Sequence, residues 1–573
     1  MISHLRPVRL SLVPLICLSV DLAQGSVRKT ASFASSSSSG YRRASFVLPS
    51  LLLHSSCTSI SQQRVGPADH HQHQAEHRGY RSFSVAHSSA HPPSTRAFAT
   101  RTSEIASPEM QSHGPVFKTD GATLPPTVEA LKQSVLKTAT GQRLSAELAE
   151  REKGAGPPHT DCKIRLFGKR EEDVRVVLYR DSAAWCPYCQ KLWMLLEEKR
   201  IPYRIEKINM RSYGDKPEWF LRANPNGLLP VIELDGQLIF ESLRIMALLE
   251  ETFQPPDHPA TLPPQGSPAM DRANDLLALE RELFGKWCSF VFRPDPLGMA
   301  RRSFESCLDK VDGELGKTEG PWFLEGEVPS IVDLQYVSHV ERMCASTLYW
   351  KGLQIRGSGR WSNIDRWFDA FDKRPSYQAS KSDYYTHVMD IPPQYGPAFS
   401  DKAGEKYRAL IDGKEASWRL PLAPLLPTDP EPTTADTNPG DEGARHQACF
   451  KLVNNLPAVA RFALRGAGLP GAKRFAAPLA DPYAQPNLNY EADMDIALRF
   501  VVHALLSGVD DQADKAMREA LVGASGSGRA DLAKCVAYVR DRVGVPRDMP
   551  YPAAMQLRAH LNWVHDALLE EKK

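Results

Sequence analysis

Apolar residues first fall into a clear repeating pattern at residue 174. The run Val174–Tyr179 is largely apolar and short, which predicts a buried strand. After it, apolar side chains recur at the spacing of one helix face, at Cys189, Leu192, Trp193 and Leu196. Pro187 suits the first position of that helix, which makes Cys186 its N-cap.

The pattern continues as alternating strands and helices up to residue 253. Asp235-Gly236 separates two short apolar runs, a typical hairpin signal. The predicted elements are a strand at Tyr203–Ile208, a short helix at Asp215–Leu221, strands at Pro230–Asp235 and Gln237–Phe240, and a helix capped by Ser242. This order predicts an α/β domain over residues 173–253.

A proline-rich break, Gln254–Pro268, precedes a region with helical periodicity only. Ser330 and Asp333 have the spacing of a capping box, which marks the start of a helix. One face of a long helix carries Leu276, Leu279, Leu283, Trp287 and Phe290, and Trp361–Lys373 predicts a further helix. We therefore expect an all-helical domain over residues 267–395.

Prolines at 392, 393 and between 421 and 439 separate a third region, residues 399–573. It also shows helical faces, one with Met494, Leu498, Val501, Val502 and Leu505, and another with Leu557, Leu561, Val564 and Leu568. Its dispersed Cys449, Cys535, His446, His503, His560 and His565 are expected to be structural. The extension is either a helical module packed on the preceding domains or a partner-binding unit.

The N-terminal part of the chain differs in composition. Asp21, Asp69 and Glu76 are the only acids before Ser103, where Ser, Arg, His and Ala dominate. Residues 1–110 therefore have the features of a disordered targeting leader, with an apolar stretch at Leu10–Leu22 ahead of a transit-like segment. This order favours import into a plastid, with a mitochondrion as the alternative. Residues 111–172 are expected to be a linker that contains one helix, Thr127–Lys137.

Composition narrows the function classes. The formal net charge is +2 for 573 residues, so nothing indicates a nucleic-acid partner, and no apolar run is long enough to span a membrane. Among ten cysteines only Cys186 and Cys189 form a close pair. Such scattered cysteines are atypical of a secreted disulfide framework and favour a reducing compartment.

The pair Cys186 and Cys189 carries the chemistry that the sequence offers. A thiolate at a helix N-terminus is stabilised by free backbone N–H groups and by the helix dipole. Cys189 lies one turn later on the inward face. We therefore expect Cys186 to be the nucleophile and Cys189 to be able to resolve a mixed disulfide.

Two other interpretations of the pair are a metal site and inert core cysteines. A structural zinc site needs a second half-site, which the spacing of the remaining Cys and His residues does not supply, so we expect no metal. An iron–sulfur cluster would need one cysteine from each subunit of a dimer together with glutathione. An inert pair conflicts with the N-cap position of Cys186, although not with that of Cys189.

Together these motifs resemble the soluble glutathione transferases. The matching segments are Cys186-Pro-Tyr-Cys189, Lys216-Pro-Glu-Trp-Phe220, Asn224-Pro-Asn-Gly-Leu-Leu-Pro-Val231 and Phe240-Glu-Ser-Leu243. The active-site cysteine is similar to that of the cysteine-type classes, and the Cys-Pro-Tyr-Cys site with a long helical tail most resembles the iota class. The resemblance implies a thioredoxin-like N-terminal domain, the family's helical C-terminal domain and an additional helical extension.

The same resemblance implies a glutathione site. A cis peptide bond is expected before Pro230, with the backbone of Leu229 facing the cysteinyl part of glutathione. Glu241 and Ser242 would hold the γ-glutamyl end, and Lys216 the glycine carboxylate. Glutathione would be a substrate, and the chain could form a homodimer.

The implied activity is glutathione-dependent thiol transfer, deglutathionylation and reduction of dehydroascorbate, through a mixed disulfide on Cys186. The alternatives are a non-catalytic protein that carries glutathione and a ligand, and a dithiol reductase that does not use glutathione. In this family the helical domain lines the pocket of the second substrate, for which Trp287, Phe290, Tyr349 and Trp350 are candidates. The sequence does not identify that substrate.

Overall fold

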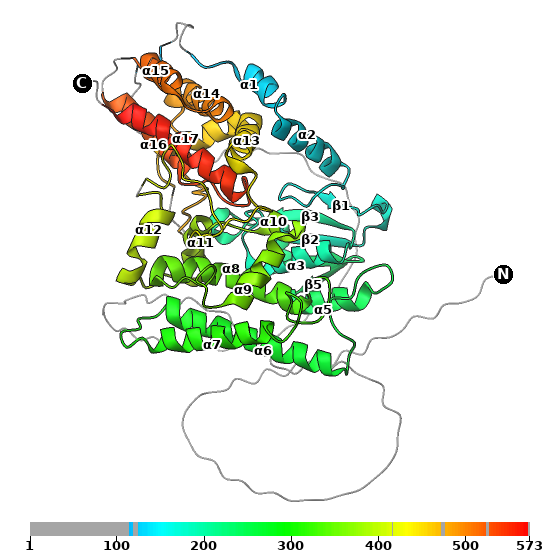
Figure 1. Cartoon of the computed structure of the whole chain (residues 1–573). Helices are drawn as coiled ribbons and strands as arrows, with labels where there is room; N and C mark the ends of the chain where they lie inside the picture. Colours follow the sequence, from blue (N-terminus) through cyan, green and yellow to red (C-terminus); the bar gives the residue numbers. More distant parts are fainter. Residues whose placement is uncertain (1–113, 119–123, 415, 472–475, 523–525, 571–573) are drawn as a thin grey trace, which may run out of the picture. The chain divides into compact units, whose positions relative to one another are not determined.

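A computed structural model of the chain describes residues 114–118, 124–414, 416–471, 476–522 and 526–570 (Figure 1). The predicted leader, residues 1–110, lies outside the described residues. All described residues belong to one compact unit.

The α/β domain is built on a five-stranded sheet in the order β1-β3-β2-β4-β5. Strand β2 lies in the middle, parallel to β3 and antiparallel to β4, and its Val176 and Leu178 side chains are buried. The predicted order of elements is confirmed, and the arrangement is thioredoxin-like. Its elements are β2 (Val176–Asp181), α3 (Pro187–Glu198), β3 (Tyr203–Ile208), α4 (Glu218–Ala223), β4 (Val231–Leu234), β5 (Gln237–Phe240) and α5 (Ser242–Thr252).

The β4–β5 hairpin confirms the turn predicted at Asp235-Gly236. Both residues have positive φ, 51° and 81°. This is the backbone that a two-residue turn needs in order to match the twist of its strands, and glycine adopts it at low cost. The turn fixes the register of β5, which in turn fixes where α5 begins.

The helix predicted at Thr127–Lys137 is present, but the described part of the segment 111–172 (residues 114–118 and 124–172) carries more regular structure than the linker that was predicted. It contains α1 (Val128–Val135), α2 (Ala139–Glu152) and β1 (Ile164–Arg165), which pairs with β3 as an edge strand. Arg165 forms a bidentate, buried ion pair with Glu197 at 2.8 Å. The two residues of β1, Ile164 and Arg165, are too few to show the periodicity that predicts a strand, and only the pairing with β3 defines it.

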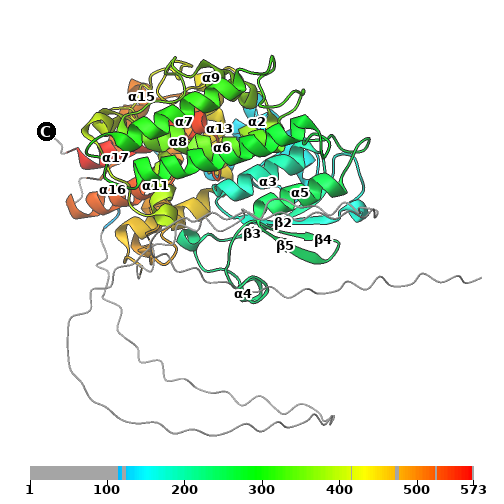
Figure 2. The same ribbon diagram turned by 90° about the horizontal axis from the view of Figure 1, so that it is seen from below.

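The helical domain covers one face of the sheet, with α3 and α5 between them (Figure 2). Helix α8 is buried along nearly its whole length. The capping box predicted at Ser330 and Asp333 is confirmed at its start. The helices are α6 (Pro268–Val291), α7 (Met299–Leu315), α8 (Ile331–Lys351), α9 (Ser362–Asp372), α10 (Pro375–Ser380) and α11 (Tyr384–Tyr395).

The extension is helical, as predicted, and it has its own core. Both predicted apolar faces are buried there, together with side chains of α1 and α2. In Figure 1 these two N-terminal helices lie beside α13 and α14, which they contact. The helices are α12 (Glu405–Ile411), α13 (Gly440–Ala463), α14 (Glu491–Ser507), α15 (Asp511–Ala520), α16 (Gly526–Arg540) and α17 (Tyr551–Leu569).

None of the helices in the described part of the chain combines the length and the apolar character that crossing a bilayer requires.

His560 on α17 is buried, and its Nδ1 lies 2.7 Å from the carbonyl oxygen of Gln556. Burial lowers the pKa of His560 from about 6.5 to about 4. When the pH falls from 7 to 5, the unfolded chain therefore takes up a proton at His560 that the folded chain does not. This difference lowers the free energy of unfolding by about 2 kcal/mol.

Urea unfolding at both pH values checks this prediction. From pH 7 to pH 5, we expect the free energy of unfolding of His560→Gln to fall by about 2 kcal/mol less than that of the native chain. Equal losses would show that His560 titrates alike in the folded and unfolded chains.

Candidate functional site

The register of the sheet brings the predicted site segments to one edge. Strand β2 ends at Asp181 opposite Ile208, the last residue of β3. Because β4 runs antiparallel to β2 and β5 runs antiparallel to β4, the start of β4 and the end of β5 lie at the same edge, where Val231 pairs with Tyr179 and Phe240. The segments that continue from these strand ends contain Cys186, Lys216, Leu229-Pro230 and Glu241-Ser242.

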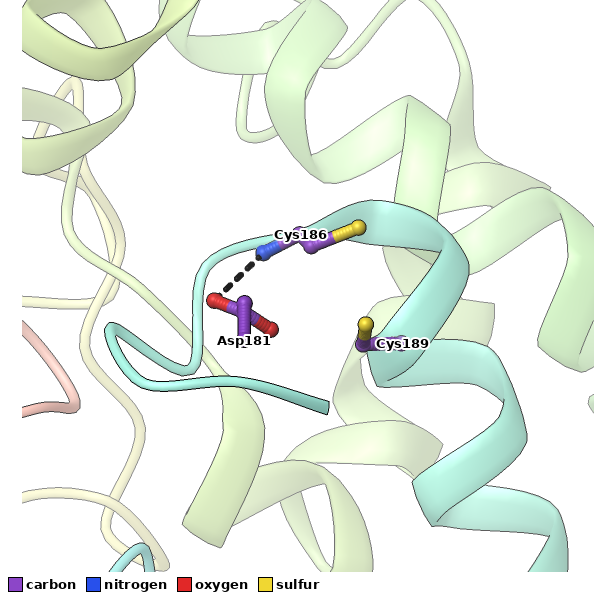
Figure 3. A group of neighbouring side chains, drawn as sticks. All are labelled: Asp181, Cys186 and Cys189. Atoms are coloured by element: carbon purple, nitrogen blue, oxygen red, sulfur yellow. Dashed lines mark hydrogen bonds between the residues drawn. The ribbon is translucent and has the colours of Figure 1, made fainter. Parts of the chain in front are cut away.

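Cys186 is the N-cap residue of α3, as predicted, and it is half-buried, whereas Cys189 is buried (Figure 3). Both are free thiols, and their sulfur atoms lie within 4.8 Å of each other. Burial raises the pKa of Cys189 well above its usual range, and its hydrogen bond with Cys186 adds to this. Cys189 is therefore a protonated thiol at neutral pH, and Cys186 is the sulfur that a substrate can reach.

Asp181, the last residue of β2, holds the cysteine loop through hydrogen bonds to its backbone. One of its carboxylate oxygens accepts hydrogen bonds from the backbone N–H of Trp185 at 2.7 Å and of Cys186 at 3.1 Å. Its other oxygen is buried and has no hydrogen-bond partner among the residues that the structure describes, and Figure 3 shows it turned toward the side of Cys189. A carboxylate oxygen of Asp181 lies within 4.8 Å of both sulfur atoms. It therefore holds the loop and places a negative charge beside the pair.

These three residues also form a set of potential metal ligands. Two thiols and one carboxylate are one ligand short of the four that a structural zinc site uses. Within the described ranges no other group of three such residues is close enough to share an ion.

Trp185, directly before Cys186, is anchored to the helical domain. Its indole N–H donates to Nδ1 of His387 at 3.0 Å, so Nε2 of His387 carries the proton that it donates to Glu341 at 2.8 Å. Burial lowers the pKa of His387. Burial alone would raise the pKa of Glu341, but His387 and Arg342 outweigh it and lower the pKa to about 2. The pair is thus a neutral imidazole against a carboxylate.

Arg342 and Gln190 close this network around the loop. Arg342 donates to the carbonyl oxygen of Trp185 and to Oε1 of Gln190 at 2.9 Å, and its guanidinium lies 4.9 Å from the centre of the Trp185 ring. The amide nitrogen of Gln190 donates to Glu341 at 3.0 Å. Because every partner is buried, the position of Cys186 depends on α8 and α11 as well as on its own helix.

Lys216 lies close enough to the cysteine pair to interact with it electrostatically. Its ammonium group donates to the backbone carbonyl of Asn209, which follows β3. Burial lowers the pKa of Lys216, and the nearby Cys189 and Cys186 oppose that effect. Lys216 is therefore a partly buried cation at the edge of the site.

The Leu229–Pro230 peptide bond is cis, as expected. Glu241 is exposed and is the N-cap of α5, so Ser242 is the first helical residue rather than the cap predicted for it. Glu241 has a φ of 69°, a conformation that costs a non-glycine residue of order 1–3 kcal/mol and is often found at functional sites. The Glu241 side chain makes no capping hydrogen bond, which leaves the first N–H groups of α5 available to an anion.

Sequence patterns missed the residues that support the loop: Asp181, Gln190, Glu341, Arg342 and His387. An acid at the end of an apolar strand, just before a cysteine pair, is a signal that could have identified Asp181.

Of the aromatic residues predicted to line a second-substrate pocket, Trp287 and Phe290 are buried in the core of the helical domain, where the Trp287 indole donates to Ser346 at 2.8 Å. Tyr349 donates to Asp412 at 3.0 Å.

Comparison with known families gives one domain match. The family described as "Glutathione S-transferase, N-terminal domain" matches residues 185–252, which run from the cysteine loop to the end of α5. The match contains Cys186, Lys216, Leu229-Pro230 and Glu241-Ser242.

Individual relatives agree with this match. "Glutathione S-transferase DHAR2" of Arabidopsis thaliana is 27% identical over 197 residues, which cover 34% of this chain and 84% of the relative. "Glutathione S-transferase DHAR3, chloroplastic" of the same plant is 27% identical over 175 residues, 30% of this chain and 60% of the relative. Among solved structures, the chain is similar to the crystal structure of Chlamydomonas reinhardtii dehydroascorbate reductase, with 21% sequence identity and a TM-score of 0.33. The similarity covers 39% of this chain and 99% of the reductase chain.

Proposed function

We propose that this chain, a member of the glutathione transferase superfamily, is a cysteine-type glutathione transferase that carries out thiol transfer and reduction of dehydroascorbate through Cys186. The observation that carries the proposal is the half-buried Cys186 at the N-terminus of α3, at the sheet edge that also carries Leu229-Pro230 and Glu241-Ser242. The long helical extension favours the iota class.

In the proposed reaction the Cys186 thiolate attacks the glutathione sulfur of a mixed disulfide. A new disulfide forms between Cys186 and glutathione, and the substrate leaves as a thiolate. The thiolate of a second glutathione then attacks the glutathione sulfur on Cys186, which releases oxidised glutathione and restores the Cys186 thiolate. Alternatively, Cys189 attacks the sulfur of Cys186, which releases glutathione and leaves an internal disulfide. Cys189 must first lose its proton, which its raised pKa disfavours.

The charges at the sheet edge support glutathione binding. The γ-glutamyl carboxylate would bind the uncapped N–H groups at the start of α5, with the Ser242 hydroxyl beside them. Glu241 would pair with the ammonium group of the same residue, and Lys216 would meet the glycine carboxylate. Leu229 would offer its backbone to the cysteinyl unit. We also propose a plastid location, which the relative named chloroplastic supports. We propose in addition that the chain forms a homodimer.

The direct test is mass spectrometry of the protein after exposure to oxidised glutathione. We expect one glutathionyl group on the peptide that contains Cys186, and retention of that group in Cys189→Ser. A protein that forms only a Cys186–Cys189 disulfide and never carries glutathione would be a dithiol reductase instead. A protein that binds glutathione but turns over no mixed disulfide would be a carrier.

Glu241→Gln combined with Ser242→Ala is expected to raise the KM for glutathione about tenfold, because one ion pair and one hydrogen bond are lost. Steady-state thiol-transferase assays over a range of glutathione concentrations check this. Glu251→Gln, an exposed acid at the other end of α5, is the matched control and should leave the KM unchanged. An unchanged KM in the double variant would contradict the assignment of the γ-glutamyl site.

A further inference from the structure

A cavity of about 610 Å³ lies between the helical domain and the extension, and it contains none of the predicted glutathione-site residues. Its walls come from the start of α11, the chain that follows α12, the proline-rich segment up to the start of α13, and the first turns of α17. A volume in the range of 300–1,000 Å³ is typical of sites for small organic ligands.

Aromatic side chains make up much of the lining: Tyr384, Tyr385, Trp418 and Tyr551. Tyr385 and Trp418 meet edge to face, with ring centres 4.8 Å apart. The Arg558 guanidinium lies within 4.7 and 4.8 Å of these two ring centres, and the helical domain and the extension thus hold the rings in place together. Rigid aromatic walls of this kind suit a flat aromatic ligand.

The lining carries more acid than base. Asp383, Asp429, Glu431 and Asp441 face one basic residue, Arg558. Most of these carboxylates have partners in the protein. Asp383 pairs with Arg558 at 2.7 Å, Asp429 accepts the Leu426 N–H, and Asp441 bonds Gln556 and Arg445.

Glu431 differs from Asp383 and Asp441, each of which has partners on both carboxylate oxygens. One of its oxygens accepts the backbone N–H of Tyr384 at 2.9 Å, and the other makes no hydrogen bond within the described part of the chain. Burial, and then the charge of Asp383, raise the pKa of this carboxyl well above its usual range. A cation near Glu431 would remove that penalty, because it stabilises the ionised form.

We propose that this cavity is a second ligand site, separate from Cys186, for a small aromatic amine. The ring of the ligand lies among the four aromatic side chains, and its ammonium group pairs with Glu431. An aromatic enclosure next to a carboxylate is a suitable environment for an organic cation. The site is independent of the proposed thiol-transferase function, since no lining residue takes part in it.

Isothermal titration calorimetry of the full chain tests the proposal with tryptamine, and with indole-3-propionate, which has the same ring and the opposite charge. We expect one equivalent of tryptamine to bind, and indole-3-propionate to bind at least about tenfold more weakly. Glu431→Gln keeps the acceptor for Tyr384 and should weaken tryptamine binding about tenfold.

Ala423→Trp places a large side chain at the cavity wall and should lower the affinity for tryptamine at least about tenfold. Ala435→Trp, on the same segment but outside the lining, is the matched control and should bind as the native chain does. Both alanines are exposed, so neither change should prevent folding. Glutathione loading of Cys186 should be equal in all variants.

Three results would overturn the proposal. The native chain could fail to bind tryptamine, the two probes could bind equally well, or Ala423→Trp could leave the affinity unchanged. Loss of glutathione loading with tryptamine binding retained would count against the proposed function alone.

Discussion

Cys186→Ser is expected to reduce the proposed thiol-transferase and dehydroascorbate-reductase activities at least about 10³-fold, to the uncatalysed background. A serine hydroxyl is not ionised near neutral pH and cannot form a disulfide with glutathione. The structure gives this position no substitute, because Cys189 is buried and holds its proton. Steady-state assays with a glutathione mixed disulfide and with dehydroascorbate measure the loss.

Cys189→Ser is the matched control for this experiment. If glutathione itself releases the product from Cys186, Cys189→Ser keeps most of the activity. Activity that survives Cys186→Ser would contradict the assignment of the nucleophile. Activity lost in both variants would show instead that the internal disulfide is obligatory. Circular dichroism of both variants confirms that neither change unfolds the chain.

The second large effect is expected from Arg558→Leu, which should lower the free energy of unfolding by about 3–5 kcal/mol. Arg558 on α17 pairs with Asp383, the N-cap residue of α11, at 2.7 Å, and both side chains are almost completely buried. Without the guanidinium, Asp383 is a buried charge with no counterion. The variant also loses the hydrogen bond to the Val543 carbonyl. Urea unfolding at pH 7 measures the change.

Arg461→Leu is the control, since Arg461 pairs with Glu491 at 3.4 Å on the surface. Exposed ion pairs contribute about 0–1 kcal/mol, and the control should stay within that range. An equally small effect of Arg558→Leu would mean that the extension does not depend on the helical domain for its stability. A large effect would show that the extension and the helical domain stabilise each other.

The order of elements in the α/β domain could be predicted because each element carries its own local signal. The strand at residue 176 is apolar, the turn at Asp235-Gly236 needs glycine, and Pro187 marks the first turn of α3. Strand β1 could not be predicted, because two residues have no periodicity and become a strand only when β3 pairs with them. The sequence places helix α2 in a linker for another reason: only Gly141 and Leu144 of its 14 residues are buried, which leaves little apolar periodicity to detect.

The candidate site divides in the same way. Its motif residues were predictable because a cysteine pair, a Pro at a strand start and a Glu-Ser at a helix start are local patterns. Glu341, Arg342 and His387 were not predictable, because each lies more than 150 residues from Trp185 in the sequence. A single arginine or histidine in a helix gives no indication of the distant group that it will bind.

The sequence by itself determined that Cys186 stands at a helix N-terminus with Cys189 one turn inside, because strand and helix periodicity depend on neighbouring residues. It also determined that a helical domain and a helical extension follow. The tertiary structure alone decided that Asp181 bonds the cysteine loop, that α8 and α11 hold Trp185, and that a cavity forms between α11 and α17. The physical reason is that burial and electrostatic pairing depend on which distant segments meet, and local periodicity does not specify that.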